Sequence, residues 1–319
     1  MKAGRITVST RKFEVIEVPA PDAGGNQVRI KVGAAGVCLS DVHFLEGILS
    51  PGYLAGDHVT LGHEVAGTID QVGEDVESCS VGERNHANQI MTLGFDYDGG
   101  WAEYLVVDAE QVMLIPDSLP FEQAAIIPDA VSTPWAAISS TGKIQAGESV
   151  AVFGVGGLGI HAVQLLRTIG CGKVIAIDPR ADARANAIAR GADFAFAPDN
   201  PELKNHRGLH AAFDFAGVSP VRKQALSMLG EQGRLIIVGI ANEPIVIPSD
   251  MAFTYMRTQI LGHYGSEAHH VRELIEFVRQ GKLDLSHSIS EVLPLASAAE
   301  ALDKLANKVG NPIRIVLKP

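Results

Sequence analysis

Residues 149–166 read SVAVFGVGGLGIHAVQLL, and this stretch decides the fold. The apolar run SVAVFG predicts a buried strand, and IHAVQLLRTIG predicts an amphipathic helix directly after it. Between them Gly154, Gly156 and Gly159 stand in G-x-G-x-x-G spacing. In this context the first glycine permits a tight turn, the second lets a pyrophosphate approach the backbone, and the third lets the helix pack on the strand. The N-terminus of the helix then offers free N–H groups to phosphates.

Strands and helices continue to alternate after this turn. KVIAID predicts a second strand and DARANAIARGA a second helix, while AAFDFAG and GRLIIVG predict two more buried strands. Before the turn, FEQAAIIPDAVSTPWAAISST looks helical, with Pro128 and Pro134 interrupting it. This rhythm predicts an α/β domain with a parallel, doubly wound sheet over residues 125–265.

Asp178 ends the second of these strands. A carboxylate at this point can accept hydrogen bonds from the ribose hydroxyls of adenosine and would repel a 2′-phosphate, which favours NAD over NADP. Arg180 keeps the alternative open, because an arginine nearby can accommodate that phosphate. A glycine-rich structural turn followed by a surface aspartate is the other interpretation, which the strand–turn–helix context disfavours.

The two ends of the chain have a different character from the middle. VRIKVGAAGV, VAGTIDQVG and AEYLVVD predict short strands in a compact, mostly β unit over residues 1–124. The tail, residues 266–319, holds the helix HHVRELIEFVRQG and the strand PIRIVLKP, and we expect it to rejoin this first unit.

Composition excludes several classes of partner. The net charge of −11 repels phosphate backbones, so nucleic acid is not an expected partner. No window approaches the roughly 20 apolar residues that span a bilayer, and MKAGRITVST lacks the apolar core of a signal peptide, so a cytoplasmic location is expected. Cys38, Cys79 and Cys171 cannot form a disulfide framework and suit a reducing compartment.

Two polar clusters occur in the N-terminal unit. GVCLSDVH contains Cys38, Ser40, Asp41 and His43, and LGHEVAG contains His63 with Glu64 after it. Thiolate, imidazole and carboxylate are the usual zinc ligands, and a catalytic site uses three of them and leaves one position open. A single cysteine or histidine would more simply be a buried core residue, but two such clusters favour a metal site.

The order GxCxSDxH, GHE and GxGxxG resembles the zinc-dependent alcohol dehydrogenases of the medium-chain dehydrogenase/reductase superfamily, over nearly the whole chain. LGHEVAGTIDQVGEDVESCSVGER and DGGWAEY resemble further signatures of that family. The resemblance implies a Rossmann domain beside a mostly β, GroES-like catalytic domain. It also implies one catalytic zinc ion, NAD as the cofactor and a small alcohol or ketone as the substrate.

The resemblance also assigns metal ligands. Cys38 and His63 match two of them, and Asp129 in IIPDAVSTPW takes the place of the third, although a helix cap would also suit an aspartate. Glu64 would be adjacent to the metal and could replace water as a fourth ligand. Asp41 would orient the His63 ring, as carboxylates do for zinc-bound histidines.

The resemblance implies the following chemistry. Zinc would lower the pKa of the bound alcohol as a Lewis acid. Ser40 would take the alcohol proton toward the cofactor ribose, and His43 would pass it to solvent as a general base. A helix cap for Ser40 and a surface position for His43 are the plainer alternatives.

Matches for the cofactor site are weaker outside the glycine turn. Thr133 resembles the residue beneath the nicotinamide, and Leu158 the apolar residue on its other side. Arg314 resembles an arginine that binds the pyrophosphate, with an ordinary surface arginine as the alternative. Gly157 and Val238 complete the expected cofactor-binding set.

One departure from the family concerns a second zinc site. Many relatives carry a lobe with four cysteines that holds a structural zinc ion, but residues 85–98 contain no cysteine. His86 alone cannot rebuild a tetrahedral site. The sequence therefore predicts that this lobe is deleted or shortened.

Two other functions compete with this interpretation. A zinc-free quinone or enoyl reductase of the same superfamily would lack the ligand set, and a catalytically inactive cofactor-binding protein would not need Ser40 and His43. Phe44, Trp135 and Tyr264 would suit a hydrophobic or secondary alcohol, or they could be core residues. The apolar run at residues 257–265 predicts a sheet edge that pairs with a second copy in a homodimer or homotetramer.

Overall fold

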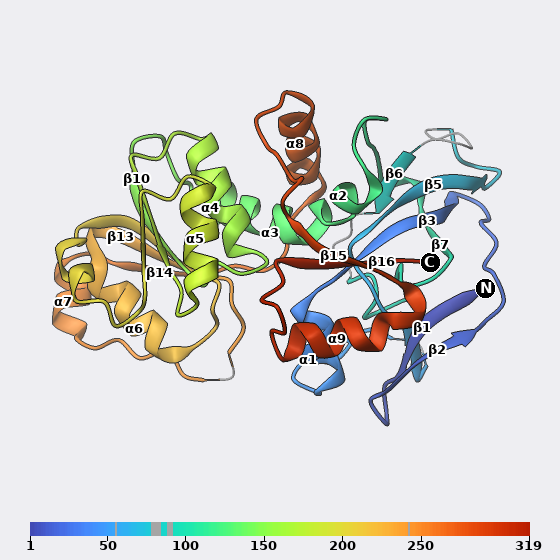
Figure 1. Cartoon of the computed structure of the whole chain (residues 1–319), viewed down its shortest axis with the longest axis horizontal. Helices are drawn as coiled ribbons and strands as arrows, with labels where there is room; N and C mark the ends of the chain where they lie inside the picture. The colour runs from blue at the N-terminus through green and yellow to red at the C-terminus, as the bar shows by residue number, and fades with distance from the viewer. Residues whose placement is uncertain (55, 78–83, 88–91, 242) are drawn as a thin grey trace. The chain divides into compact units, whose positions relative to one another are not determined.

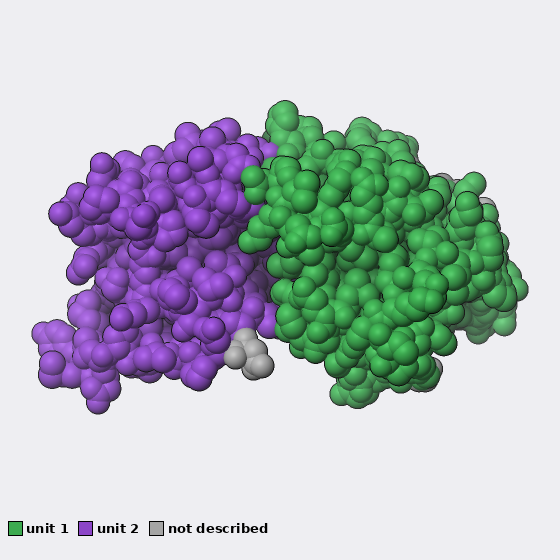
Figure 2. Space-filling view, turned by 60° about the horizontal axis from the view of Figure 1, so that its bottom comes forward, with its two compact units in different colours: residues 1–130, 266–319 green, residues 131–265 purple. Residues whose placement is uncertain are grey.

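The computed structural model describes the whole chain except residues 55, 78–83, 88–91 and 242, so Cys79 lies outside the described residues. The chain forms two compact units, shown in Figures 1 and 2. Unit 1 comprises Met1–Ala130 and Ser266–Pro319, and unit 2 comprises Val131–Gly265. The chain leaves unit 1 later than residue 124, because the helix α2 (Phe121–Ala125) still packs against strands of unit 1.

Unit 2 is built on a six-stranded sheet in the order β11-β10-β9-β12-β13-β14, with every adjacent pair parallel. Its strands are β9 (Ser149–Phe153), β10 (Lys173–Ile177), β11 (Phe194–Phe196), β12 (Leu209–Asp214), β13 (Leu229–Ile237) and β14 (Gln259–Gly262). This is the strand order of a doubly wound dinucleotide fold, whose two halves meet between β9 and β12. The predicted α/β architecture is confirmed.

Helices connect these parallel strands, as crossovers between parallel neighbours require. They are α4 (Gly159–Thr168), α5 (Ala181–Ala189), α6 (Ser219–Met228) and α7 (Asp250–Tyr255), with a 3₁₀ turn at Pro201–Asn205, whereas α3 (Ser132–Ala136) precedes the first strand. The proline-interrupted segment is irregular, since α3 stands between π-helical turns at Ile127–Val131 and Ala137–Thr141. Because all six strands run the same way, their carboxyl ends share one edge, where ligands of such sheets bind.

Unit 1 contains two sheets. A three-stranded sheet has the order β2-β1-β4, formed by β1 (Lys2–Thr7), β2 (Lys12–Glu17) and β4 (His58–Thr60). A seven-stranded sheet has the order β15-β16-β3-β5-β6-β8, and β7 also pairs with β3. Its strands are β3 (Gln27–Val37), β5 (Val65–Val72), β6 (Arg84–Ala87), β7 (Tyr104–Asp108), β8 (Val112–Leu114), β15 (Ile289–Pro294) and β16 (Arg314–Lys318).

The C-terminal segment rejoins unit 1 through β16, which pairs antiparallel with the end of β3. The helices of this unit besides α2 are α1 (Leu39–Leu45), α8 (Ala268–Arg279) and α9 (Ala298–Ala306), with 3₁₀ turns at Ala109–Gln111 and Leu295–Ser297. Alternate residues of β3 point into a core that contains Ile30, Phe44 and Trp101, all fully buried. The end of β3 is therefore held rigidly, and it leads directly into α1.

Within the described part of the chain, no helix combines the length and apolarity needed to cross a membrane.

Candidate metal centre and cofactor site

Three predicted metal ligands meet in unit 1. Cys38 follows the last residue of β3 and precedes α1, His63 lies between β4 and β5, and Asp129 lies in the π-helical turn Ile127–Val131. Cys38 Sγ lies 3.2 Å from Asp129 Oδ2, and His63 Nε2 lies 3.6 Å from the same oxygen. The three ligand atoms all lie within 4.8 Å of one another.

This spacing fits a tetrahedral ion. Zinc–ligand bonds of about 2.0–2.3 Å place ligand atoms roughly 3.3–3.7 Å apart, close to the two separations measured from Asp129. The donor set is one thiol, one imidazole and one carboxylate, which are all zinc ligands. Three protein ligands leave a fourth position for a small molecule, as catalytic zinc sites do.

Asp41 holds two of these ligands. It is fully buried, and its Oδ2 accepts a hydrogen bond of 2.9 Å from the backbone amide of Cys38. Its Oδ1 lies 3.5 Å from Nδ1 of His63. A carboxylate on the far side of the imidazole fixes the ring so that Nε2 faces the other ligands.

The electrostatics of the site favour a cation. Burial lowers the pKa of His63, but the charge of Asp41 and hydrogen bonds to Asp129, Asp41 and Cys38 outweigh it and raise that pKa well above its ordinary value. The negative surroundings that hold a proton on this ring would equally attract a divalent ion, which takes the place of the proton when it binds.

Glu64 and Arg314 form a buried pair next to the ligands. Arg314 Nη2 lies 3.3 Å from Glu64 Oε1 and 3.8 Å from Asp129 Oδ2, and its Nη1 donates to the carbonyl of Val37 at 3.0 Å. Glu64 Oε1 also accepts from the amide of Ala130 at 2.8 Å. Burial raises the pKa of the Glu64 carboxyl, and Arg314 opposes that shift. Its Oε2 is buried with no hydrogen-bond partner among the described residues.

A glycine makes room for this carboxylate. A Cβ atom on Gly36 would lie 1.8 Å from Glu64 Oε2, so no other residue fits there unless Glu64 moves. The carbonyl of Gly36 accepts the indole N–H of Trp101 at 2.9 Å. Trp101 in turn lies against Gly62, whose φ is +96°, and a Cβ there would lie 2.2 Å from the indole ring. The residue before His63 must therefore be small.

The two predicted proton-relay residues lie on α1. Ser40 Oγ lies 3.4 Å from His63 Nε2, so the structure brings this hydroxyl to the ligand cluster. His43 is half-buried one turn further along, and the described contacts include no hydrogen bond between its ring and Ser40. The serine is thus at the site, whereas the second step of the relay stays a prediction.

Sequence reasoning missed the aromatic wall of this cluster. Phe95 is buried, its ring centroid lies 5.7 Å from that of His63, and it stacks on Phe44 at 4.8 Å. Phe44 is a fully buried core residue, Trp135 is also buried, and Tyr264 is 76% exposed. Phe95 lies three positions before the DGGWAEY motif, and that proximity was the available signal.

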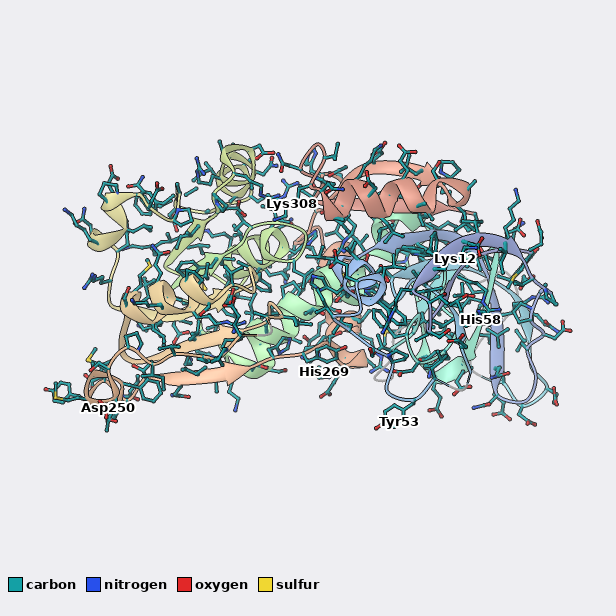
Figure 3. The ribbon with its side chains drawn as sticks, turned by 90° about the horizontal axis from the view of Figure 1, so that it is seen from below. Lys12, Tyr53, His58, Asp250, His269 and Lys308 are labelled. Carbon is teal, nitrogen blue, oxygen red and sulfur yellow. The ribbon has the colours of Figure 1, made fainter. Side chains whose placement is uncertain are left out.

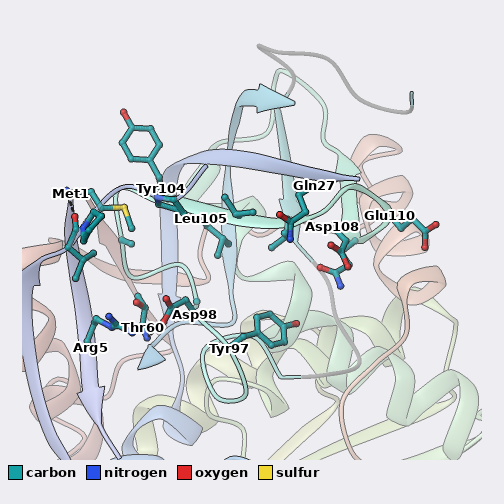
Figure 4. A pocket seen from close by; sticks show the side chains of 18 of the residues that line it. Met1, Arg5, Gln27, Thr60, Tyr97, Asp98, Tyr104, Leu105, Asp108 and Glu110 are labelled. Atoms are coloured by element: carbon teal, nitrogen blue, oxygen red, sulfur yellow. Dashed lines mark hydrogen bonds and ion pairs between the residues drawn. The ribbon is translucent and has the colours of Figure 1, made fainter. Parts of the chain in front are cut away.

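A cavity of unit 1 lies elsewhere. It measures about 890 Å³ and is lined by parts of β1 and β7 and by the loop with Tyr97 and Asp98 (Figure 4). None of the predicted metal ligands lines it.

In unit 2, the glycine turn has the predicted local geometry. Gly154 has φ +81°, and a Cβ there would lie 2.9 Å from the backbone of Ala216. A Cβ on Gly159 would lie 1.9 Å from the carbonyl oxygen of Gly154. Leu158 directly precedes α4, and Gly157 accepts a hydrogen bond of 2.7 Å from the ring of a buried histidine on that helix. The turn can therefore present its backbone to a phosphate at the start of α4.

Asp178 is hydrogen-bonded to Arg180, a pairing that the sequence alone did not predict. Its Oδ1 and Oδ2 each accept a 3.0 Å hydrogen bond from the guanidinium of Arg180, and Oδ2 also accepts the amide of Val155 at 3.0 Å. Burial alone would raise the pKa of Asp178, but these hydrogen bonds outweigh it and lower that pKa. The carboxylate is only 2% exposed, so Arg180 covers the group expected to meet the ribose.

The remaining predicted cofactor residues fall in both units. Thr133 lies in α3, and Val238 directly follows β13, with its amide donating to the carbonyl of Asp214 at 3.0 Å. Arg314 belongs to unit 1, where Glu64 and Val37 engage it as described above. Its binding to a pyrophosphate stays a prediction.

Comparisons with known proteins agree with this geometry. A family model described as zinc-binding dehydrogenase matches residues 157–280, and one described as the alcohol dehydrogenase GroES-like domain matches residues 24–117. The sorbitol dehydrogenase of Bacillus subtilis is 27% identical, covering 100% of this chain and 97% of its own. An alcohol dehydrogenase of Geobacillus stearothermophilus is 29% identical, covering 100% and 99%.

A solved structure has the same fold as this chain. The 2R,3R-butanediol dehydrogenase from Bacillus subtilis superimposes with a TM-score of 0.90 at 24% identity, over 100% of this chain and 99% of that one. The alignment with the sorbitol dehydrogenase runs over 353 residues, against 319 in this chain, so that relative is longer. The shorter length fits the deleted or shortened lobe.

Proposed function

Since this chain belongs to the zinc-dependent alcohol dehydrogenases of the medium-chain dehydrogenase/reductase superfamily, we propose that it interconverts a hydrophobic secondary alcohol and its ketone with NAD. The observation that carries the proposal is the meeting of Cys38, His63 and Asp129 at ligand-to-ligand distances in a chain that also has the glycine turn. We assign the metal to unit 1 and NAD to unit 2.

Cys38, His63 and Asp129 would hold the zinc ion, and Asp41 would orient the imidazole from behind. When bound there, zinc supplies Lewis acidity toward an alcohol or carbonyl oxygen. Glu64 stands ready as a further carboxylate, because its Oε2 has no hydrogen-bond partner among the described residues. The positive charge of Arg314 offsets the negative charge of the Glu64 carboxylate and so reduces the net negative charge of the site.

Ser40 would accept the proton of the alcohol and pass it toward the cofactor ribose, since its hydroxyl lies 3.4 Å from Nε2 of His63, the nitrogen that faces the other ligands. His43 would exchange that proton with solvent from its half-buried position on the same helix. Phe95 would exclude water on one side of the cluster, and its ring favours an apolar substituent on the reacting carbon. This wall supports the preference for a hydrophobic alcohol.

NAD would lie along the carboxyl edge of the six-stranded sheet of unit 2. The turn of Gly154, Gly156 and Gly159 would hold the pyrophosphate at the N-terminus of α4. Asp178 and Arg180 would meet the adenosine ribose, and Thr133 with Leu158 would hold the nicotinamide.

The assembly that we propose is a homodimer or homotetramer built on β14. This strand ends the six-stranded sheet and carries half-buried apolar residues. The helix α7, which begins at Asp250 (Figure 3), adds Met251 and Tyr255, which are 78% and 84% exposed. An apolar strand edge is a liability unless it is paired. Sedimentation at micromolar concentration should give at least a dimer, and a monomer would contradict the assembly.

A combined metal and activity assay tests the main proposal. Purified protein should contain about one zinc ion per chain, because the described residues offer one ligand cluster. A panel of alcohols with NAD, followed by NADH absorbance, should show turnover that a chelator removes. Protein that reduces quinones or enones without zinc would instead be a zinc-free reductase.

A further inference from the structure

A histidine outside every motif ties the last strand of unit 2 to the first helix of that unit. His263 directly follows β14, and its backbone amide donates to the carbonyl of Ile237 at 2.9 Å. Its ring Nε2 lies 3.0 Å from the carbonyl oxygen of Thr133, and its Nδ1 lies 2.8 Å from the hydroxyl oxygen of Thr141. The His263 side chain therefore links the end of β14 to Thr133 in α3 and to Thr141 in the π-helical turn that follows.

The chemistry of the two partners fixes the ring. A carbonyl oxygen can only accept, so Nε2 of His263 must carry a proton and donate to Thr133. In the neutral ring Nδ1 then accepts a hydrogen bond from the Thr141 hydroxyl. With both nitrogens engaged, the ring can neither flip nor rotate without losing a hydrogen bond.

The segment that it holds is an irregular one. The helix α3 is short, and π-helical turns flank it at Ile127–Val131 and Ala137–Thr141. The carbonyl of Thr133 accepts within the helix from the amide of Ala137, and His263 supplies a bond from outside it. Because single π turns are rare and occur frequently at functional sites, a bond from outside to the short helix between two of them marks this backbone as one whose position matters.

The sheet order shows which half of a dinucleotide lies nearby. The glycine turn follows β9 at the centre of the sheet, and Asp178 follows β10 on one side. In a doubly wound sheet the two mononucleotide halves lie on opposite sides of the central switch point. His263 follows β14, on the side opposite Asp178, and so belongs to the half that receives the second nucleotide.

We propose that His263 is a positioning residue for the nicotinamide end of the cofactor site. The hydrogen bond from His263 to the carbonyl of Thr133 sets the position and orientation of the start of α3, against which the nicotinamide ring would lie. The inference depends on the proposed binding of NAD to unit 2, and it adds a residue that none of the motifs contains.

Three single variants of the full chain test this role. His263→Leu keeps the volume but removes both hydrogen bonds. His263→Gln keeps a donor for Thr133 and an acceptor for Thr141. His210→Leu is the matched control, because that exposed histidine accepts a 3.0 Å bond from the amide of Ser149 at the amino ends of β9 and β12, in the centre of the same sheet.

The measured quantity is the affinity for two ligands that differ only in the nicotinamide ring. NADH is titrated by its own fluorescence, and ADP-ribose, which lacks the nicotinamide, is titrated by competition. His263→Leu should weaken NADH binding about three- to tenfold, the range expected for loss of the hydrogen bond to the Thr133 carbonyl, and should reduce the blue shift of bound NADH. It should leave ADP-ribose binding unchanged. His263→Gln should restore most of the NADH affinity, and His210→Leu should change neither ligand.

Equal weakening of NADH and ADP-ribose by His263→Leu would overturn the inference, because it would indicate general damage to the sheet edge. An unchanged NADH affinity and emission would overturn it as well. Wild-type protein that binds neither ligand would refute the proposed function itself, and this result is distinct from both of the others.

Discussion

The choice between NAD and NADP should depend on the charge of Asp178. We predict that Asp178→Asn increases the affinity for NADPH, because it removes the negative charge while an amide oxygen can still accept from the backbone N–H of Val155. In the wild-type chain Asp178 also neutralises Arg180 through two hydrogen bonds of 3.0 Å each. The variant therefore removes a repulsion and leaves the guanidinium without its countercharge.

The magnitude follows from the charges involved. Two unit charges 4 Å apart interact by about 4 kcal/mol at an effective dielectric constant of about 20. Arg180 is half-buried, so water and salt reduce this figure, and we take about 1.5–3 kcal/mol for a 2′-phosphate beside it. This range corresponds to about a 10- to 150-fold gain in NADPH affinity. NADH affinity should fall severalfold, since a charged acceptor for the ribose hydroxyls is lost.

Fluorescence titration with NADH and NADPH measures both changes. Burial would raise the pKa of Asp178, but hydrogen bonds from Arg180 and Val155 keep it below its ordinary value, so Asp178 should stay charged between pH 6 and 8. A carboxyl with a lowered pKa stabilises the fold above its ordinary pKa and loses that contribution only as the pH falls through the lowered value. The contribution of Asp178 to stability is therefore constant in this pH range.

The double variant Asp178→Asn/Arg180→Ala provides the control. If the freed guanidinium attracts the phosphate, the double variant should lose most of the NADPH gain. Two results would refute the reasoning: a wild-type chain that already binds NADPH as tightly as NADH, or a single variant whose NADPH affinity does not change.

Three further changes test the site and the fold. Cys38→Ala should remove zinc, measured by metal analysis, and abolish turnover while NADH still binds; full activity in this variant would refute the zinc mechanism. Ser40→Ala should keep zinc and NADH binding but lower kcat about a hundred- to ten-thousand-fold, the range for a general acid–base group; a smaller than tenfold loss would exclude its proton role. Arg222→Met should lower the free energy of unfolding by about 3–5 kcal/mol in urea titrations, because it leaves a buried charge without its partner. Arg222 Nε lies 2.9 Å from Oδ2 of the fully buried Asp214. A loss below 1 kcal/mol would show that the Asp214 carboxyl is protonated instead.

Features with a local physical cause could be predicted from the sequence. The glycine turn was predictable because the positive φ of Gly154 and the contact of Gly159 with the Gly154 carbonyl are both local to the turn. The strands and helices of unit 2 follow from short-range apolar periodicity. The metal ligands Cys38, His63 and Asp129 were identified by residue type and resemblance, and the structure adds that their ligand atoms converge within 4.8 Å.

Other features depend on contacts between distant segments, which no local pattern encodes. The carbonyl of Val37 meets Arg314 277 positions away, which places that arginine beside Glu64 in unit 1. His263 reaches Thr133 across 130 positions, and no motif marks the histidine. The pairing of Asp178 with Arg180 spans only two positions, yet it requires the backbone to turn at the end of β10 so that the guanidinium folds back. The sequence by itself thus determined which functional side chains the chain carries. It also determined, through apolar periodicity, the strands and helices on which they lie. Only the tertiary structure decided which of those groups neutralise, orient or cover one another, because these interactions depend on distances set by the packing of whole sheets.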